Sequence, residues 1–117
     1  MQFLMTLTIG HTSAPPQALQ DAMTRLVDGE TAAGRVVVSG GLAPSSDGRL
    51  VTLSGGELTV SESADSRMPM DGFAVLEAAS MDEAISRAAP FLMLHQEHLE
   101  NWAGECTVRP IVTHCLP

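Results

Sequence analysis

The sequence contains no lysine and no tyrosine, and Asn101 is its only asparagine. Without lysine the chain cannot form the Schiff base of a pyridoxal-phosphate enzyme, and it cannot carry the phosphate-binding P-loop, whose motif requires a lysine. Without tyrosine it has no tyrosine general acid. A shortage of lysine, asparagine and tyrosine together is typical of GC-rich coding, so we expect a bacterial source.

Positive charge is scarce. Six arginines stand against 14 acidic residues, and the formal net charge of the 117-residue chain is −8. The arginines are scattered, whereas nucleic-acid binding needs a basic stripe and anionic membranes attract polybasic clusters. We therefore expect neither a nucleic-acid partner nor a membrane partner.

Cysteine, aromatic residues and long apolar runs are also few. Cys106 and Cys115 are nine residues apart in one predicted terminal strand and tail, which extended would span roughly 30 Å, so we expect no disulfide between them. No segment approaches the roughly 20 apolar residues of a membrane helix, and the apolar stretch over 3–9 is a poor signal peptide. The expected location is the cytoplasm.

Hydrophobic periodicity predicts a sequence of eight elements in one domain over 1–117. Ser80 and Glu83 form a capping box at the start of a helix, which Pro90 should break or kink before a second helical stretch over 91–102. A proline at position 110 places the last strand at a sheet edge. The order β-α-β-β-β-β-α-β predicts the α+β class, with a split βαβ, ferredoxin-like unit. The predicted strands are 2–9, 35–42, 49–53, 57–60, 72–78 and 105–113, and the first helix is 15–28.

Four motifs follow one another along the chain. They are Gly40-Gly41-Leu42-Ala43-Pro44, the segment Asp71-Gly72-Phe73-Ala74-Val75-Leu76-Glu77, the helix start Ser80-Met81-Asp82-Glu83-Ala84, and Val108-Arg109-Pro110-Ile111. In this order and spacing they resemble the YCII-related family, in its DGPF-motif branch. The position of the DGPF motif itself is degenerate, since Val60-Ser61-Glu62-Ser63 stands there, and Arg67 lies near the position of the family's lysine. The resemblance implies a ferredoxin-like unit that forms a homodimeric α/β barrel.

The candidate catalytic residues are His11 and Asp71. His11 follows the first predicted strand in a Gly-His-Thr-Ser loop, and loops at strand ends often reach a cleft. As a base, His11 would need a carboxylate to orient its ring, for which Asp71 or Glu77 is available. The alternative is that His11 is an exposed loop residue.

His95 and His98 share an apolar face of the helix predicted over 91–102. Three interpretations stay open: packing in the core or at a subunit interface, the wall of a small-molecule pocket, or a metal site. Zinc sites need more ligands than an i, i+3 histidine pair supplies, and no spacing in the chain predicts them, so we expect no metal.

Three further residues are candidate ligand contacts. Ser39 and Ser45 flank the glycine-rich bend and could present hydroxyl groups to an anion, although a tight bend or bulge explains the glycines more simply. Arg109 either pairs with a carboxylate such as Glu77 or binds an anionic substrate.

Two functions are compatible with these residues. The first is binding of a small organic molecule in a dimeric-barrel cleft, with cofactor-free acid/base chemistry of the lyase or isomerase type. The second is a non-catalytic binding or regulatory dimer, whose interaction surface is the helix face over 91–102. The expected partners are a second copy of the chain and a small-molecule ligand, with no cofactor.

Overall fold

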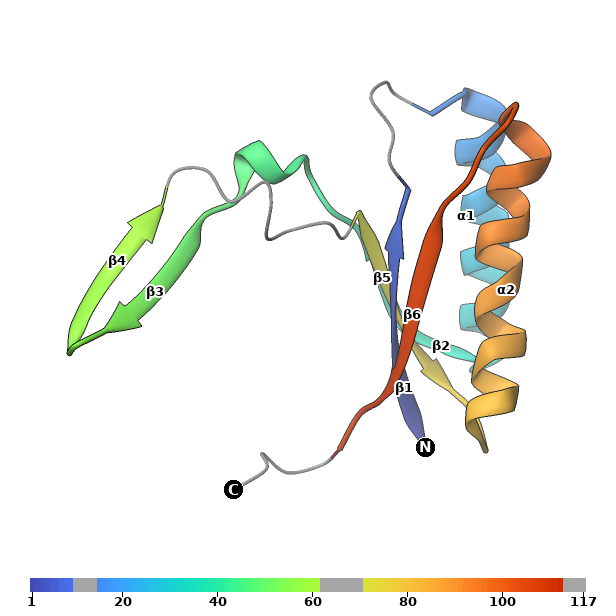
Figure 1. Ribbon diagram of the computed structural model, residues 1–117. Helices are drawn as coiled ribbons and strands as arrows, with labels where there is room; N and C mark the ends of the chain where they lie inside the picture. The colour runs from blue at the N-terminus through green and yellow to red at the C-terminus, as the bar shows by residue number, and fades with distance from the viewer. Residues whose placement is uncertain (10–14, 62–70, 113–117) are drawn as a thin grey trace.

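The computed structural model describes residues 1–9, 15–61 and 71–112, apart from the side chain of Ser45. The elements follow the predicted order, with a short 3-10 helix, η1, added (Figure 1). Among the described residues no helix is long and apolar enough to cross a membrane. The elements are β1 (Gln2–Thr8), α1 (Gln17–Ala32), β2 (Val36–Gly41), η1 (Ser45–Asp47), β3 (Leu50–Ser54), β4 (Glu57–Ser61), β5 (Gly72–Glu77), α2 (Met81–His98) and β6 (Glu105–Pro110).

Four strands form an antiparallel sheet in the order β2-β5-β1-β6. α1 connects β1 to β2, which have β5 between them, and α2 connects β5 to β6, which have β1 between them. This interleaving is the split βαβ arrangement, so the predicted ferredoxin-like α+β class is confirmed for the chain. Its dimerisation into a barrel stays a prediction.

Both helices cover the same face of the sheet (Figure 1). The alternation of β1 explains this, because Phe3, Met5 and Leu7 are only 1–3% exposed and face the helices, while Leu4 and Thr6 face away. Ala74 and Leu76 continue the buried face on β5, and Ala84, Ala88 and Phe91 close it from α2. The core therefore lies in the single layer between sheet and helices.

α2 runs unbroken through Pro90, so the predicted break at this residue was wrong. A proline within a helix removes one hydrogen bond and costs about 3 kcal/mol. Here Ala88 and Phe91, on either side, are both 2% exposed and hold the helix against the sheet. Pro90 itself faces solvent, where water can hydrate the carbonyl that has lost its donor. The capping prediction is confirmed for Ser80, whose hydroxyl accepts from the Glu83 N–H at 3.2 Å. The Glu83 carboxylate pairs with Arg87, so the reciprocal half of the capping box stays a prediction.

The ends of α1 and β6 also differ from prediction. α1 passes through Gly29 and stops before Gly34, whose φ of 77° suits a residue without a Cβ. β6 is an edge strand, as Pro110 predicted, and ends at that residue. Cys106 is half-buried in β6, and burial raises the pKa of its thiol. Cys115 lies outside the described residues, so the absence of a disulfide stays a prediction.

β3 and β4 form a separate two-stranded hairpin, which we call the hairpin arm (residues 50–61). Its turn residues, Gly55 and Gly56, have φ values of 58° and 78°, as a two-residue type I′ turn requires. The arm projects to the side of the sheet opposite the helices (Figure 1). In a plain split βαβ unit a short turn would join β2 to β5, so the arm is an insertion in that connection.

Candidate functional site

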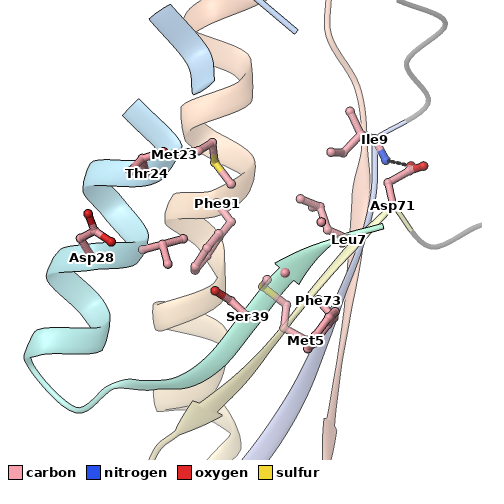
Figure 2. Close-up of a pocket in the computed structure, with 14 residues that line it drawn as sticks. Met5, Leu7, Ile9, Met23, Thr24, Asp28, Ser39, Asp71, Phe73 and Phe91 are labelled. Atoms are coloured by element: carbon pink, nitrogen blue, oxygen red, sulfur yellow. Dashed lines mark hydrogen bonds between the residues drawn. The ribbon is translucent and has the colours of Figure 1, made fainter. Parts of the chain in front are cut away.

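A cavity of about 310 Å³ lies between α1 and the helix-facing side of the sheet, and we call it the α1 cavity (Figure 2). Its apolar walls come from β1, α1, β5 and α2. Its polar groups come from α1, β2 and the start of β5. The apolar residues are Met5, Leu7, Ile9, Met23, Val27, Phe73 and Phe91, and the polar ones are Thr24, Asp28, Ser39 and Asp71.

The cavity exists because the helix and strands that surround it do not meet there. In the described part of the chain α1 packs against β2 and α2, but makes little contact with β1 or β5. Three glycines, Gly40, Gly41 and Gly72, line this region and contribute no side chain to fill it. A core poor in aromatic residues and rich in alanine and methionine leaves such space open.

Asp71 is fixed at the rim of the cavity by three hydrogen bonds. Its carboxylate Oδ2 accepts from the Ile9 N–H at 2.6 Å (Figure 2), its own N–H donates to the Leu7 carbonyl at 2.7 Å, and its carbonyl accepts from the Leu42 N–H at 2.8 Å. The end of β1 and the start of β5 therefore hold one anionic group in a defined place.

A β-bulge turns Ser39 toward the cavity. Val36 pairs with Leu76 but Val38 pairs with Val75, so β2 carries one extra residue between these pairs. Val36 is 3% exposed under the helices, whereas Val37 and Val38 are 52% and 50% exposed. The extra residue shifts the alternation by one, and Ser39 consequently lies on the helix side near Phe91 (Figure 2).

α1 supplies the remaining polar lining. Thr24 donates its hydroxyl hydrogen bond to the Gln20 carbonyl at 3.0 Å, one turn back in the helix. Asp28, one turn further on, is exposed at the other side of the cavity. The described lining thus contains two carboxylates and no positively charged side chain, so its electrostatics disfavour an anionic ligand.

His95 and His98 do not line the α1 cavity. His95 is 3% exposed, its Nδ1 lies 2.7 Å from the Phe91 carbonyl, and its ring stacks on Trp102 with centroids 5.1 Å apart. His98 Nδ1 lies 3.0 Å from the Leu94 carbonyl. Because a carbonyl only accepts, the proton in both contacts sits on Nδ1. Of the three interpretations of this pair, the structure favours packing within the chain.

The predicted interaction surface over 91–102 needs correction for the same reason. α2 ends at His98, and Asn101, with φ of 52°, turns the chain so that Trp102 returns over His95. Phe91 and His95 are therefore covered inside one chain and are not available to a partner. Leu94, His98 and Trp102 are half-buried, so a contact through the rest of this face stays a prediction.

Arg109 lies on the solvent-facing side of β6, away from the cavity. Its predicted pairing with Glu77 is wrong because β1 separates their strands: Arg109 lies opposite Leu4, and Glu77 lies opposite Gln2. Glu77 Oε2 instead lies 3.2 Å from the amino-terminal nitrogen.

Of the predicted site residues, the structure brings Asp71 and Ser39 together in one cavity. His11 and the side chain of Ser45 lie outside the described part. Sequence reasoning did not single out Met23, Thr24, Val27 or Asp28 as site residues. The helical spacing of Leu19, Met23 and Val27 is the signal that could have identified the inward face of α1. Within the described ranges no three His, Cys, Asp or Glu side chains gather closely enough to hold a metal ion.

Comparison with known proteins identifies a similar solved structure. No family model matches the sequence, and no curated protein does. The solved structure is 5-chloro-2-hydroxyhydroquinone dehydrochlorinase (TftG) from Burkholderia phenoliruptrix AC1100, in complex with 2,5-dihydroxybenzoquinone. It is 22% identical in sequence, with a TM-score of 0.47, and the match covers 96% of this chain and 94% of TftG.

Proposed function

We propose that this protein binds a small organic molecule in the α1 cavity. The observation that carries the proposal is a cavity of about 310 Å³ with apolar walls and a fixed carboxylate at its rim. Sites for small molecules are concave and mostly apolar, with a few polar groups that set orientation, and they begin at about this volume.

The lining defines the kind of molecule. Apolar contacts from Leu7, Val27 and Phe91 suit a ring or a branched hydrocarbon body. The Ser39 hydroxyl can donate or accept a hydrogen bond, whereas an ionised Asp71 can only accept. The expected ligand is therefore neutral or cationic, with an O–H or N–H group that can reach the rim.

The chemistry that we propose for this site is proton transfer without a cofactor. Asp71 would orient the base or take up a second proton, and His11, two residues after Ile9 in the sequence, would be the base. A carboxylate beside a histidine favours the charged imidazolium and so raises the histidine pKa. We expect NMR titration to show a lower pKa for His11 in Asp71→Asn than in the wild type. An unchanged pKa of His11 would contradict the proposed role of Asp71 in orienting the histidine ring.

A non-catalytic binding protein is the second candidate. It is favoured by the described cavity lining, in which Asp71 and Asp28 are the only titratable side chains. Binding without turnover would then be the function. An Asp71→Asn variant that binds as tightly as the wild type, with an unchanged His11 titration, would support this second candidate.

The binding experiment uses two probes with the same ring system. N-phenyl-naphthylamine is neutral, and anilinonaphthalene sulfonate is its anionic analogue. We expect fluorescence titration to show tighter binding of the neutral probe, because the described lining is acidic. Equal or tighter binding of the sulfonate would contradict the proposed ligand class.

A matched pair of valine substitutions tests whether the neutral probe binds in the α1 cavity. Val27→Phe fills the cavity and should weaken binding of the neutral probe by at least about tenfold. Val37→Phe introduces the same side chain at an exposed position of β2 outside the cavity and should leave affinity unchanged. If both variants bind like the wild type, the α1 cavity is not the site.

A further inference from the structure

The hairpin arm has one apolar face that its own chain leaves exposed. In the β3–β4 register Val51 lies opposite Val60, and Leu53 lies opposite Leu58, so these four side chains share a face. They are 56%, 60%, 70% and 65% exposed, respectively. The other face carries Thr52 and Thr59, whose hydroxyls hydrogen-bond each other.

Neither strand of the arm packs substantially against any other element in the described part of the chain. A lone two-stranded hairpin is at best marginally stable in water, and monomers rarely leave contiguous apolar patches of this kind exposed. The body of the protein shows what the same alternation does when it is covered, since the equivalent positions of β1 are 1–3% exposed.

The chain exposes more surface than a compact monomer does. The solvent-accessible area is 7968 Å², whereas a compact monomer of 12.3 kDa exposes about 6,100 Å². The radius of gyration is 16.1 Å, compared with about 13 Å for a compact domain of this length. An arm that projects from the body is consistent with both values (Figure 1).

We propose that the hairpin arm docks its apolar face on a second copy of this chain. The arm projects on the same side as the sheet face that the helices leave uncovered (Figure 1). That face carries Leu4 and Val75, which are only half-buried, so a second copy seated there lies within reach of the arm. A two-fold arrangement lets each chain extend its arm to the other and closes the assembly at two copies.

The charge of the arm's apolar face is compatible with the same occupant. Each chain has a net charge of −8, so two copies repel each other as whole molecules, and a contact between them requires faces without carboxylates. The four side chains of the arm's apolar face are uncharged, which makes this face suitable for contact between acidic chains. The proposal does not depend on the α1 cavity.

A pair of lysine substitutions at adjacent positions tests the proposal. Leu53→Lys places a charge on the apolar face, and Thr52→Lys places the same charge on the opposite face. Light scattering after size exclusion should give a wild-type particle of twice the chain mass. Leu53→Lys should raise the dissociation constant by at least about tenfold, and Thr52→Lys by much less. Circular dichroism should stay unchanged in both, because neither residue lies in the core.

Two outcomes would overturn the proposal. A wild-type chain that is monomeric at every accessible concentration excludes a second copy as the occupant. A dimer that Leu53→Lys and Thr52→Lys weaken equally, or not at all, shows that the arm's apolar face is not part of its interface.

Discussion

The body of the protein and the hairpin arm follow the same sequence pattern and reach opposite states. Alternate residues of β1 and of the arm are apolar, yet Met5 is 2% exposed and Leu53 is 70% exposed. The body has two helices in the same chain to cover its strands, while the arm has no covering element in the described part. Alternation thus predicts that a face will be covered but not which element, or which chain, covers it.

The largest difference between the two regions should appear when a leucine is truncated. Leu76 is fully buried in the core, so Leu76→Ala should lower the free energy of unfolding by about 3 kcal/mol. Leu53→Ala, measured where the chain is monomeric, should change it by less than about 0.5 kcal/mol. Urea denaturation measures both. A comparable loss in the two variants would mean that the arm packs on its own body.

A glycine of the body should be the next most sensitive position. A Cβ at Gly104 would collide with the Trp102 ring and lie 3.0 Å from the Thr8 carbonyl, so Gly104→Ala should cost about 2 kcal/mol. The emission of Trp102, the only tryptophan, should shift as its stacking on His95 is disturbed. Gly29→Ala, with open space around its Cβ in α1, is the control and should stabilise the chain by about 0.5–1 kcal/mol. An unshifted emission in Gly104→Ala would contradict the packing described.

A substitution in the turn of the arm should affect dimerisation rather than the stability of the monomer. Gly56 has φ of 78°, so Gly56→Ala strains the hairpin by about 1 kcal/mol. Because the arm is not part of the body's core, the strain should weaken dimerisation without lowering the free energy of unfolding of the monomer. Analytical ultracentrifugation and dilute urea denaturation separate these effects. If Gly56→Ala lowers the free energy of unfolding of the monomer as much as it weakens dimerisation, the arm is part of the folded body and the comparison fails.

The smallest effect should come from an ion pair on the surface of the body. Arg35 donates to both carboxylate oxygens of Glu30, at 2.6 and 2.9 Å, and this hydrogen bonding lowers the pKa of Glu30 below its ordinary value of 4.5. A lowered native pKa stabilises the fold above the unfolded-state pKa, and that stability is lost as the pH falls through the native pKa.

Thermal melts at neutral pH should therefore show a lower melting temperature for Glu30→Gln than for the wild type. The decrease should be smaller than that caused by Gly104→Ala, and it should vanish in acid. Glu97→Gln, an exposed position of α2, serves as the control and should show no such pH dependence. A difference that persists in acid would mean that the pair contributes through packing rather than charge.

The elements of the body could be predicted because each has a local cause. Alternation predicts β1, the Ser80 capping box predicts the start of α2, and Pro110 predicts an edge strand. The continuity of α2 through Pro90 could not be predicted, since it depends on the burial of Ala88 and Phe91 against strands distant in the sequence.

The site was predictable in part for the same reason. Asp71 stands at a strand end, where candidate residues are sought, whereas Ser39 faces the cavity only because a bulge shifts the register of β2. His95 and His98 share an apolar face, as predicted, but Trp102 returns from a turn to cover His95, which helical spacing alone does not reveal. The cavity itself arises from the spacing of α1 above the sheet, a property of packing.

Amide hydrogen exchange as a function of protein concentration tests most directly whether a second copy completes the arm. Amides of β1 and β5 should be protected at every concentration, since they lie inside the body's own sheet. Amides of β3 and β4 should be protected in concentrated samples and lose at least about a hundredfold of that protection on dilution to monomer. Arm amides that exchange equally fast, or equally slowly, at all concentrations would contradict the account.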